Sequence, residues 1–204
     1  VRRRLSYVFQ YPEHQFVGGT VRDEVLFGLG VRHQEPRAAQ RRTQDVLERF
    51  GLAPLAEASP YTLSHGQKRR LSVATALVTE PEMLILDEPT FGQDRRHTDE
   101  LMSTLRGLHR EGRTIVVITH DLSLVAEHAC RVAALDAGEV LFDGSPHHLF
   151  ARPEILNRCH LRRPPVAEAF SLARDAGSAC PAAISLTEAA SVLGPIHDGR
   201  PGGI

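Results

Sequence analysis

The sequence lacks the features that define several broad protein classes. Cysteine occurs only at Cys130, Cys159 and Cys180, and this count and spacing are typical of neither a disulfide framework nor a zinc site. Apolar runs such as Met83–Leu86 are far shorter than the roughly 20 residues needed to cross a bilayer. With 24 basic and 25 acidic residues, the formal net charge of −1 favours no broad attraction to nucleic acid. We therefore expect a cytosolic chain that spans no membrane, is not exported and binds no nucleic acid.

Strands and helices alternate along the first 119 residues. Apolar periodicity, proline and glycine mark the elements and their ends. The predicted elements are a strand at Leu5–Phe9, a helix beginning near Thr20, helices at Pro36–Phe50 and Gln67–Val78, a strand at Met83–Leu86, a helix at Asp94–Arg110 and a strand at Thr114–Thr119. Such alternation indicates an α/β fold with a mainly parallel sheet covered by helices.

The pattern changes in the last third of the chain. Two short strands, Val132–Leu135 and Glu139–Phe142, flank Asp136-Ala137-Gly138, which predicts a hairpin turn. Pro, Ala, Gly and Ser then become frequent, so we expect residues 153–204 to form a small, partly disordered C-terminal extension with a disordered Gly-Pro end. Its weak helices are predicted at Val166–Arg174 and Thr187–Leu193.

The strongest local signal is the acidic pair Asp87-Glu88, which directly follows an apolar strand. Open parallel sheets bind ligands at the carboxyl ends of their strands. Asp87 is suited to hold a hydrated Mg²⁺ ion that neutralises nucleotide phosphates, and Glu88 to act on an attacking water as general base or polarising group. Taken alone, such a pair is also typical of a solvated turn.

A second signal lies about twenty residues earlier, at the start of a predicted helix. Within Leu63-Ser64-His65-Gly66-Gln67, the Ser64 hydroxyl and the backbone amides near Gly66 can meet a phosphate at a helix N-terminus. The other interpretation is a serine N-cap followed by a basic first turn. Together with the acidic pair, the segment favours phosphate binding.

Five segments in this order resemble those of the ATP-binding-cassette (ABC) ATPases, over roughly Leu5 to Gly144. They are a glutamine loop at Gln10, a signature segment at Leu63–Gln67, a Walker B strand ending in Asp87-Glu88, a D-loop at Phe91–Asp94 and a switch histidine at His120. The signature departs from the common pattern at His65, where glycine is usual, but it keeps Gly66.

The resemblance implies a role for each matching residue. Gln10 would sense Mg²⁺ and the attacking water, and would link the site to a membrane subunit. His120 would hydrogen-bond the γ-phosphate. The signature residues Ser64, Gly66 and Gln67 would meet the nucleotide bound by a second ATPase subunit. Asp94 would lie at that dimer interface.

A narrower resemblance is to the energy-coupling-factor group of ABC importers. It is carried by five segments, Phe9–Val21, Asp23–Val25, Phe27-Gly28, the loop Phe91–Asp94 and the tail motif Arg163–Val166. The resemblance implies ATP hydrolysis with Mg²⁺ that energises uptake of a metal ion or vitamin. It also implies a second ATPase subunit, a transmembrane coupling subunit and a substrate-binding membrane subunit, with this chain peripheral at the cytoplasmic face of the membrane.

The phosphate-binding loop Gly-x-x-x-x-Gly-Lys-Ser/Thr does not occur in the sequence, and the only lysine, Lys68, stands beside the signature segment. We expect that the first strands and this loop (Walker A) are missing from an otherwise P-loop NTPase-like domain. The predicted organisation is a partial ABC ATPase domain at residues 1–152, with a helical subdomain at about 20–80, and the extension at 153–204. Alone, the chain is expected to be inactive.

Two other readings of the motifs stay open. A non-transport cassette protein, acting in chromosome maintenance or translation, would carry a long coiled coil between Gln10 and Leu63 or strongly basic arms, and the sequence shows neither. A catalytically inert regulatory cassette would fit the absent phosphate loop. Glu88 and His120, which an inert cassette does not need, argue against it.

Overall fold

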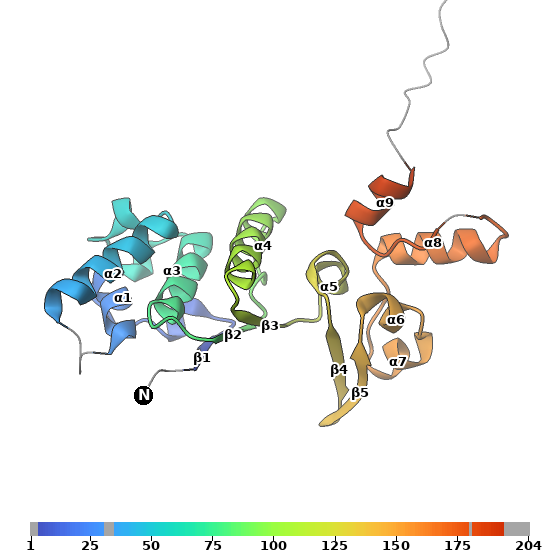
Figure 1. The fold of residues 1–204 in the computed structure, drawn as a ribbon, viewed down its shortest axis with the longest axis horizontal. Helices are drawn as coiled ribbons and strands as arrows, with labels where there is room; N and C mark the ends of the chain where they lie inside the picture. The colour runs from blue at the N-terminus through green and yellow to red at the C-terminus, as the bar shows by residue number, and fades with distance from the viewer. Residues whose placement is uncertain (1–3, 31–34, 180, 194–204) are drawn as a thin grey trace, which may run out of the picture. The chain divides into compact units, whose positions relative to one another are not determined.

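The structure, a computed structural model, describes residues 4–30, 35–179 and 181–193. It consists of two compact units, Val1–Thr119 and His120–Ile204. The acidic pair, the glutamine loop and the signature segment all belong to the first unit, whereas His120 is the first residue of the second. The elements of each unit are shown in Figure 1.

The first unit alternates strands and helices as the sequence predicts. Its α-helices and strands are β1 (Leu5–Val8), α1 (Val21–Leu29), α2 (Pro36–Arg49), α3 (His65–Leu77), β2 (Met83–Asp87), α4 (Arg95–Arg110) and β3 (Thr114–Ile118). Short 3-10 helices occur at η1 (Pro12–His14), η2 (Ala53–Leu55) and η3 (Pro60–Thr62). The predicted α/β fold is confirmed, with element ends within about two residues of those expected.

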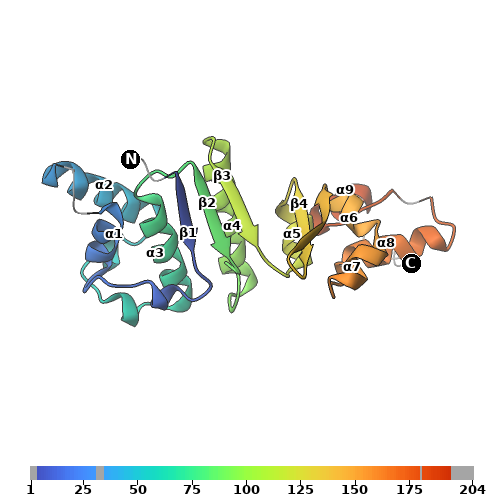
Figure 2. The same ribbon diagram turned by 90° about the horizontal axis from the view of Figure 1, so that it is seen from below.

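The sheet of the first unit is parallel, with β2 between β1 and β3 (Figure 2). Helices α3 and α4 lie on one face of it in both views (Figures 1 and 2). Leu84 and Leu86 of β2 are fully buried, whereas Val116 and Ile118 of β3 are 38% and 47% exposed. Because side chains alternate along a strand, the burial of Leu84 and Leu86 anchors β2 and thereby holds its carboxyl end in place.

Helices α1, α2 and α3 contact one another and match the region predicted as a helical subdomain. The Thr20 side chain caps α1 by accepting a hydrogen bond from the Asp23 N–H. Val21 and Val25 of α1, Leu47 of α2 and Leu71 of α3 are completely buried, so apolar packing joins the three helices. The subdomain boundary itself stays a prediction.

The second unit begins with helix α5 and a hairpin. Its elements are α5 (Leu122–His128), β4 (Val132–Asp136), β5 (Glu139–Gly144), α6 (Pro146–Phe150), α7 (Pro153–Arg158), α8 (Pro165–Asp175) and α9 (Leu186–Leu193). The predicted hairpin is confirmed: β4 and β5 are antiparallel, and Ala137 and Gly138 have φ of 47° and 82°. Positive φ at both central residues is what a tight type I′ turn requires.

One apolar core joins the elements of the second unit. Leu122 of α5, Phe142 of β5 and Leu149 of α6 pack together with Leu156 of α7 and Ile184 before α9. Residues on both sides of the predicted boundary at 152 therefore share a core, while the boundary as a limit of the ATPase domain stays a prediction. The predicted helices of the extension are present as α8 and α9, and its Gly-Pro end lies outside the described residues.

Candidate functional site

The acidic pair lies at the carboxyl end of the central strand. Asp87 is the last residue of β2 and is in register with Ile118 of β3. Glu88 follows, donating its backbone N–H to the Ile118 carbonyl at 2.9 Å. The Thr119 hydroxyl donates to Glu88 Oε2 at 3.3 Å. The pair is therefore held by the sheet and by the residues that leave β3.

Glu88 has a backbone conformation that its sequence does not reveal. Its φ is +41°, a region that is unfavourable for a residue with a long side chain and costs on the order of 1–3 kcal/mol. The Phe91 N–H donates to the Glu88 carbonyl at 3.1 Å and helps to hold this conformation. Such strain persists only where surrounding structure imposes it, and it clusters at functional sites.

Asp87 and Gln10 line the same cavity. The cavity measures about 390 Å³ and is lined by Phe9, Gln10, Tyr11, His14, Gln15 and Asp87. The structure thus brings together two residues that are 77 positions apart in the sequence. A carboxylate and a side-chain amide are oxygen donors of the kind that Mg²⁺ prefers, so these residues fit the ion that the sequence predicts.

Tyr7 is a neighbour of Asp87 that sequence reasoning missed. Its hydroxyl donates a hydrogen bond to Asp87 Oδ2 at 2.9 Å, and this bond raises the pKa of Tyr7. Tyr7 and Asp87 come from adjacent strands, β1 and β2. An apolar strand with one tyrosine carries no sign of this contact, because the partner is specified only by strand pairing.

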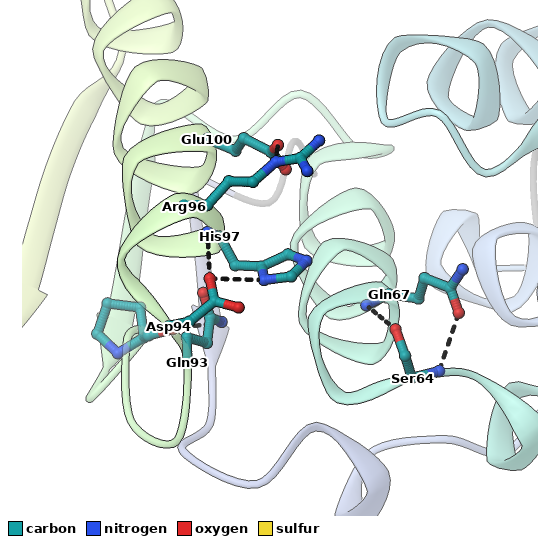
Figure 3. Close-up of polar contacts among 8 residues, drawn as sticks. Ser64, Gln67, Gln93, Asp94, Arg96, His97 and Glu100 are labelled. Atoms are coloured by element: carbon teal, nitrogen blue, oxygen red, sulfur yellow. Dashed lines mark hydrogen bonds and ion pairs between the residues drawn. The ribbon is translucent and has the colours of Figure 1, made fainter.

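The signature segment forms the N-terminus of α3 through a reciprocal cap. The Gln67 N–H donates to Ser64 Oγ at 3.3 Å, and the Ser64 N–H donates to Gln67 Oε1 at 2.9 Å (Figure 3). This is a capping box, which satisfies two backbone donors. The serine N-cap interpretation is therefore correct for the fold, and contact of Ser64, Gly66 and Gln67 with a phosphate stays a prediction.

The capping box leads to a testable prediction about the stability of α3. Ser64→Ala removes the acceptor for the Gln67 N–H and should lower the free energy of unfolding by about 1 kcal/mol. Urea denaturation followed by circular dichroism measures the change. Ser59→Ala is the control, because Ser59 precedes η3 without a side-chain cap hydrogen bond. Equal losses in the two variants would show that the Ser64 cap does not stabilise α3.

Asp94 of the D-loop caps the next helix. Asp94 Oδ1 accepts hydrogen bonds from the His97 N–H at 2.9 Å and from His97 Nδ1 at 2.8 Å (Figure 3). These bonds hold the pKa of Asp94 below its ordinary value. Because a carboxylate only accepts, His97 carries a proton on Nδ1. The position of Asp94 at a dimer interface stays a prediction.

Two histidines connect the D-loop to the signature segment, and the sequence indicated neither contact. His65 Nε2 lies 3.1 Å from the Phe91 carbonyl, to which it must donate. The His97 ring points from α4 toward α3 (Figure 3), where a side chain added at Gly66 would come within 3.0 Å of His97 Cδ2. His65 therefore replaces the more usual glycine with a residue that contacts the D-loop.

His120 opens the second unit, directly before the N-cap of α5. The following residue, Asp121, accepts hydrogen bonds from the Ser123 and Leu124 N–H groups at 2.9 and 3.2 Å. This cap fixes how the chain enters α5. The predicted contact of His120 with a γ-phosphate stays a prediction.

Comparison with known proteins decides the family. The family model described as "ABC transporter" matches residues 1–91. The energy-coupling factor transporter ATP-binding protein EcfA2 of Symbiobacterium thermophilum is 38% identical over 204 residues, which cover 99% of this chain and 71% of that protein. The chain belongs to the ABC transporter ATPase family. The family and the fold predicted from the five motifs are thus confirmed, and members of this family bind and hydrolyse ATP.

Other similar proteins are also ATP-binding proteins or components of ABC transporters. The putative HMP/thiamine import ATP-binding protein YkoD of Bacillus subtilis is 47% identical over 74% of this chain, which spans only 27% of that protein. The solved structure of CbiO1 from Clostridium perfringens, which is described as part of the ABC transporter complex cbiONQ, matches with a TM-score of 0.68 and 33% identity. That match covers 82% of this chain and 67% of CbiO1. Among the described residues, no helix is long and apolar enough to span a bilayer.

Proposed function

We propose that this ABC ATPase powers an importer of the energy-coupling-factor type, hydrolysing ATP at the cytoplasmic face of the membrane to drive uptake of a metal ion or vitamin. The observation that carries the proposal is the meeting of Gln10 and Asp87 in one cavity, with Glu88 next along the chain. The names of the relatives EcfA2 and YkoD support the importer class.

The residues near the carboxyl end of β2 have separate roles in hydrolysis. Asp87 and Gln10 would hold Mg²⁺, which when bound neutralises the charge of the nucleotide phosphates. Glu88 orients the attacking water and accepts its proton or polarises it. The hydrogen bond from the Thr119 hydroxyl keeps one Glu88 oxygen in place for this task. His120 supplies the hydrogen bond to the γ-phosphate.

The signature segment and D-loop serve a second ATPase subunit. Ser64, Gly66 and Gln67 would contact the nucleotide held by that subunit, with the N-terminus of α3 favouring the negative phosphates. Asp94 would lie at the interface. The hydrogen bond of His65 to the Phe91 carbonyl, and the approach of the His97 ring to the space beside Gly66, support this assignment, because they bring the D-loop next to the signature segment.

Reconstitution tests the proposed function. The chain would be co-expressed with a second ATPase subunit, a transmembrane coupling subunit and a substrate-binding membrane subunit, and the complex placed in proteoliposomes. We expect co-purification, ATP-dependent phosphate release and uptake of either a thiamine-type vitamin or a divalent cobalt or nickel ion. A complex that neither forms nor hydrolyses ATP would contradict the proposal.

A second prediction concerns where the coupling subunit binds on this chain. We expect a helix of that subunit to dock between the glutamine loop and α1, and Tyr11, Val17 and Phe27 of these segments are 46%, 63% and 60% exposed. Apolar side chains that remain exposed are available to contact a partner protein. A thiol-attached photocrosslinker on Val17→Cys should therefore capture the coupling subunit on illumination.

The control for this crosslink uses the hairpin. All variants would be made in a background lacking Cys130, Cys159 and Cys180, so that no native thiol reacts. Ala137→Cys, in the exposed hairpin turn, should give no crosslink. Capture through Ala137 instead of Val17 would place the membrane subunit elsewhere and contradict the prediction.

A further inference from the structure

Arg69 is the largest fully buried side chain among the described residues, with 1% of its surface exposed. It lies in α3, close to the signature residues Ser64 and Gly66. Burial lowers its pKa to about 10, so the guanidinium still carries its charge at neutral pH. A buried cation is unfavourable unless its N–H groups find acceptors, so the partners of Arg69 are important.

The acceptors of Arg69 are backbone carbonyls from two segments of the proposed site. Nη1 donates to the Phe9 carbonyl at 2.7 Å, and Nη2 donates to the Gln10 carbonyl at 2.5 Å. Nη2 also lies 3.4 Å from the Glu88 carbonyl. Hydrogen bonds from a charged donor are roughly twice as strong as neutral ones. One side chain thus joins the glutamine loop to Glu88.

Both segments have just left the sheet, but the Glu88 carbonyl also accepts a hydrogen bond from the Phe91 N–H, so the donor is needed most by the glutamine loop. Strand β1 ends at Val8 and β2 ends at Asp87, so the carbonyls that follow must find partners outside the strand ladder. The positive φ of Glu88 turns its backbone out of the strand direction. A guanidinium satisfies several such carbonyls at once, because its donors diverge from one planar group.

We infer that Arg69 is a positioning residue for hydrolysis, which holds the glutamine loop and the Glu88 backbone in one arrangement with the signature helix α3. This role rests on the proposed function, and Arg69 acts through Gln10 and Glu88 without touching the nucleotide. The signature helix cannot shift relative to the glutamine loop without breaking charged hydrogen bonds. Arg69 thereby couples the segment that faces a second ATPase subunit to the residues that orient the water.

Hydrogen exchange on the purified chain tests the link itself. Arg69→Met keeps much of the side-chain volume and removes every donor, and Arg70→Met is the matched control. Among the described residues, Arg70 makes no hydrogen bond to either segment. We expect amide exchange in the peptides containing Gln10 and Glu88 to rise about tenfold or more in Arg69→Met only.

Two results of the exchange experiment would contradict the role of Arg69. Equal exchange in Arg69→Met and Arg70→Met, or a rise in neither segment, would overturn the inference. Circular dichroism establishes that the variants are folded. If Arg69→Met does not fold, Arg69→Lys replaces it, because lysine keeps the charge but carries its donors on a single nitrogen that cannot serve both segments.

Turnover in the assembled transporter tests the consequence. We expect Arg69→Met to lower kcat about 10- to 100-fold, because a displaced water-orienting group is costly, with KM for ATP changed by less than about twofold. The kcat of Arg69→Lys should lie between that of the wild type and that of Arg69→Met. A purely structural role would lower the amount of active complex and leave kcat per complex unchanged, which would overturn the inference. If the wild-type complex hydrolyses no ATP, the proposed function fails. Hydrogen exchange still tests whether Arg69 holds the glutamine loop and the Glu88 backbone.

Discussion

In a version of the chain that also carries a phosphate-binding loop and is assembled into the transporter, replacing Glu88 by glutamine is expected to reduce ATP turnover by a factor of about 100 or more while ATP binding persists. The amide has the same shape and can still accept the hydrogen bond from the Thr119 hydroxyl. It cannot take a proton from water. The phosphate contacts come from other residues, so affinity for ATP should change little.

Phosphate release and equilibrium ATP binding, measured on the same complex, separate the two effects. Glu82→Gln is the matched control, because Glu82 directly precedes β2 at the opposite end of the strand and is exposed. Its turnover should equal that of the wild type. Unchanged turnover in Glu88→Gln would remove Glu88 from the catalytic role, and lost ATP binding would indicate a role in holding the nucleotide.

Replacing Gly18 by alanine is expected to lower the free energy of unfolding by about 3 kcal/mol. A Cβ atom at this position would lie 2.4 Å from the Glu24 nitrogen, 2.7 Å from the Glu24 Cα and 2.9 Å from the Asp23 carbonyl carbon. All three atoms belong to the backbone of α1. The new methyl group cannot be accommodated unless the chain before α1 moves away from the helix.

That movement would also break a buried anchor. The Glu24 carboxylate, 2% exposed, accepts hydrogen bonds from the Val17 and Gly18 N–H groups, each at 2.7 Å. Separating them leaves a buried carboxylate and two backbone donors without partners, which is costly. The segment after the glutamine loop would then lose its fixed position on α1.

The neighbouring glycine provides the control. A Cβ at Gly19 would meet only Asp23 Oδ2, at 3.8 Å, which is an ordinary contact. Gly19→Ala should therefore change the free energy of unfolding by less than about 0.5 kcal/mol in urea denaturation. Similar losses for the two variants would mean that the chain before α1 yields easily and that close packing at Gly18 is not required.

Some elements of this fold are specified locally, and these were predictable. Pro36 begins α2 as expected of a proline in the first helical turn, and Ala137-Gly138 forms the predicted hairpin turn. The short helices α5, α6 and α7, of seven, five and six residues, were not predicted. Helices of this length are not stable by propensity alone, so they depend on the core shared by Leu122, Phe142 and Leu156.

By itself, the sequence determined the order of the motifs and therefore the family, because Gln10, the signature segment, Asp87-Glu88 and the D-loop are recognised by residue type and spacing along the chain. Only the tertiary structure decided what holds them in place. Tyr7 reaches Asp87 through strand pairing, and Arg69 reaches carbonyls about 60 residues away. The partners of a buried polar group are set by which segments pack around it, and no local pattern encodes that choice.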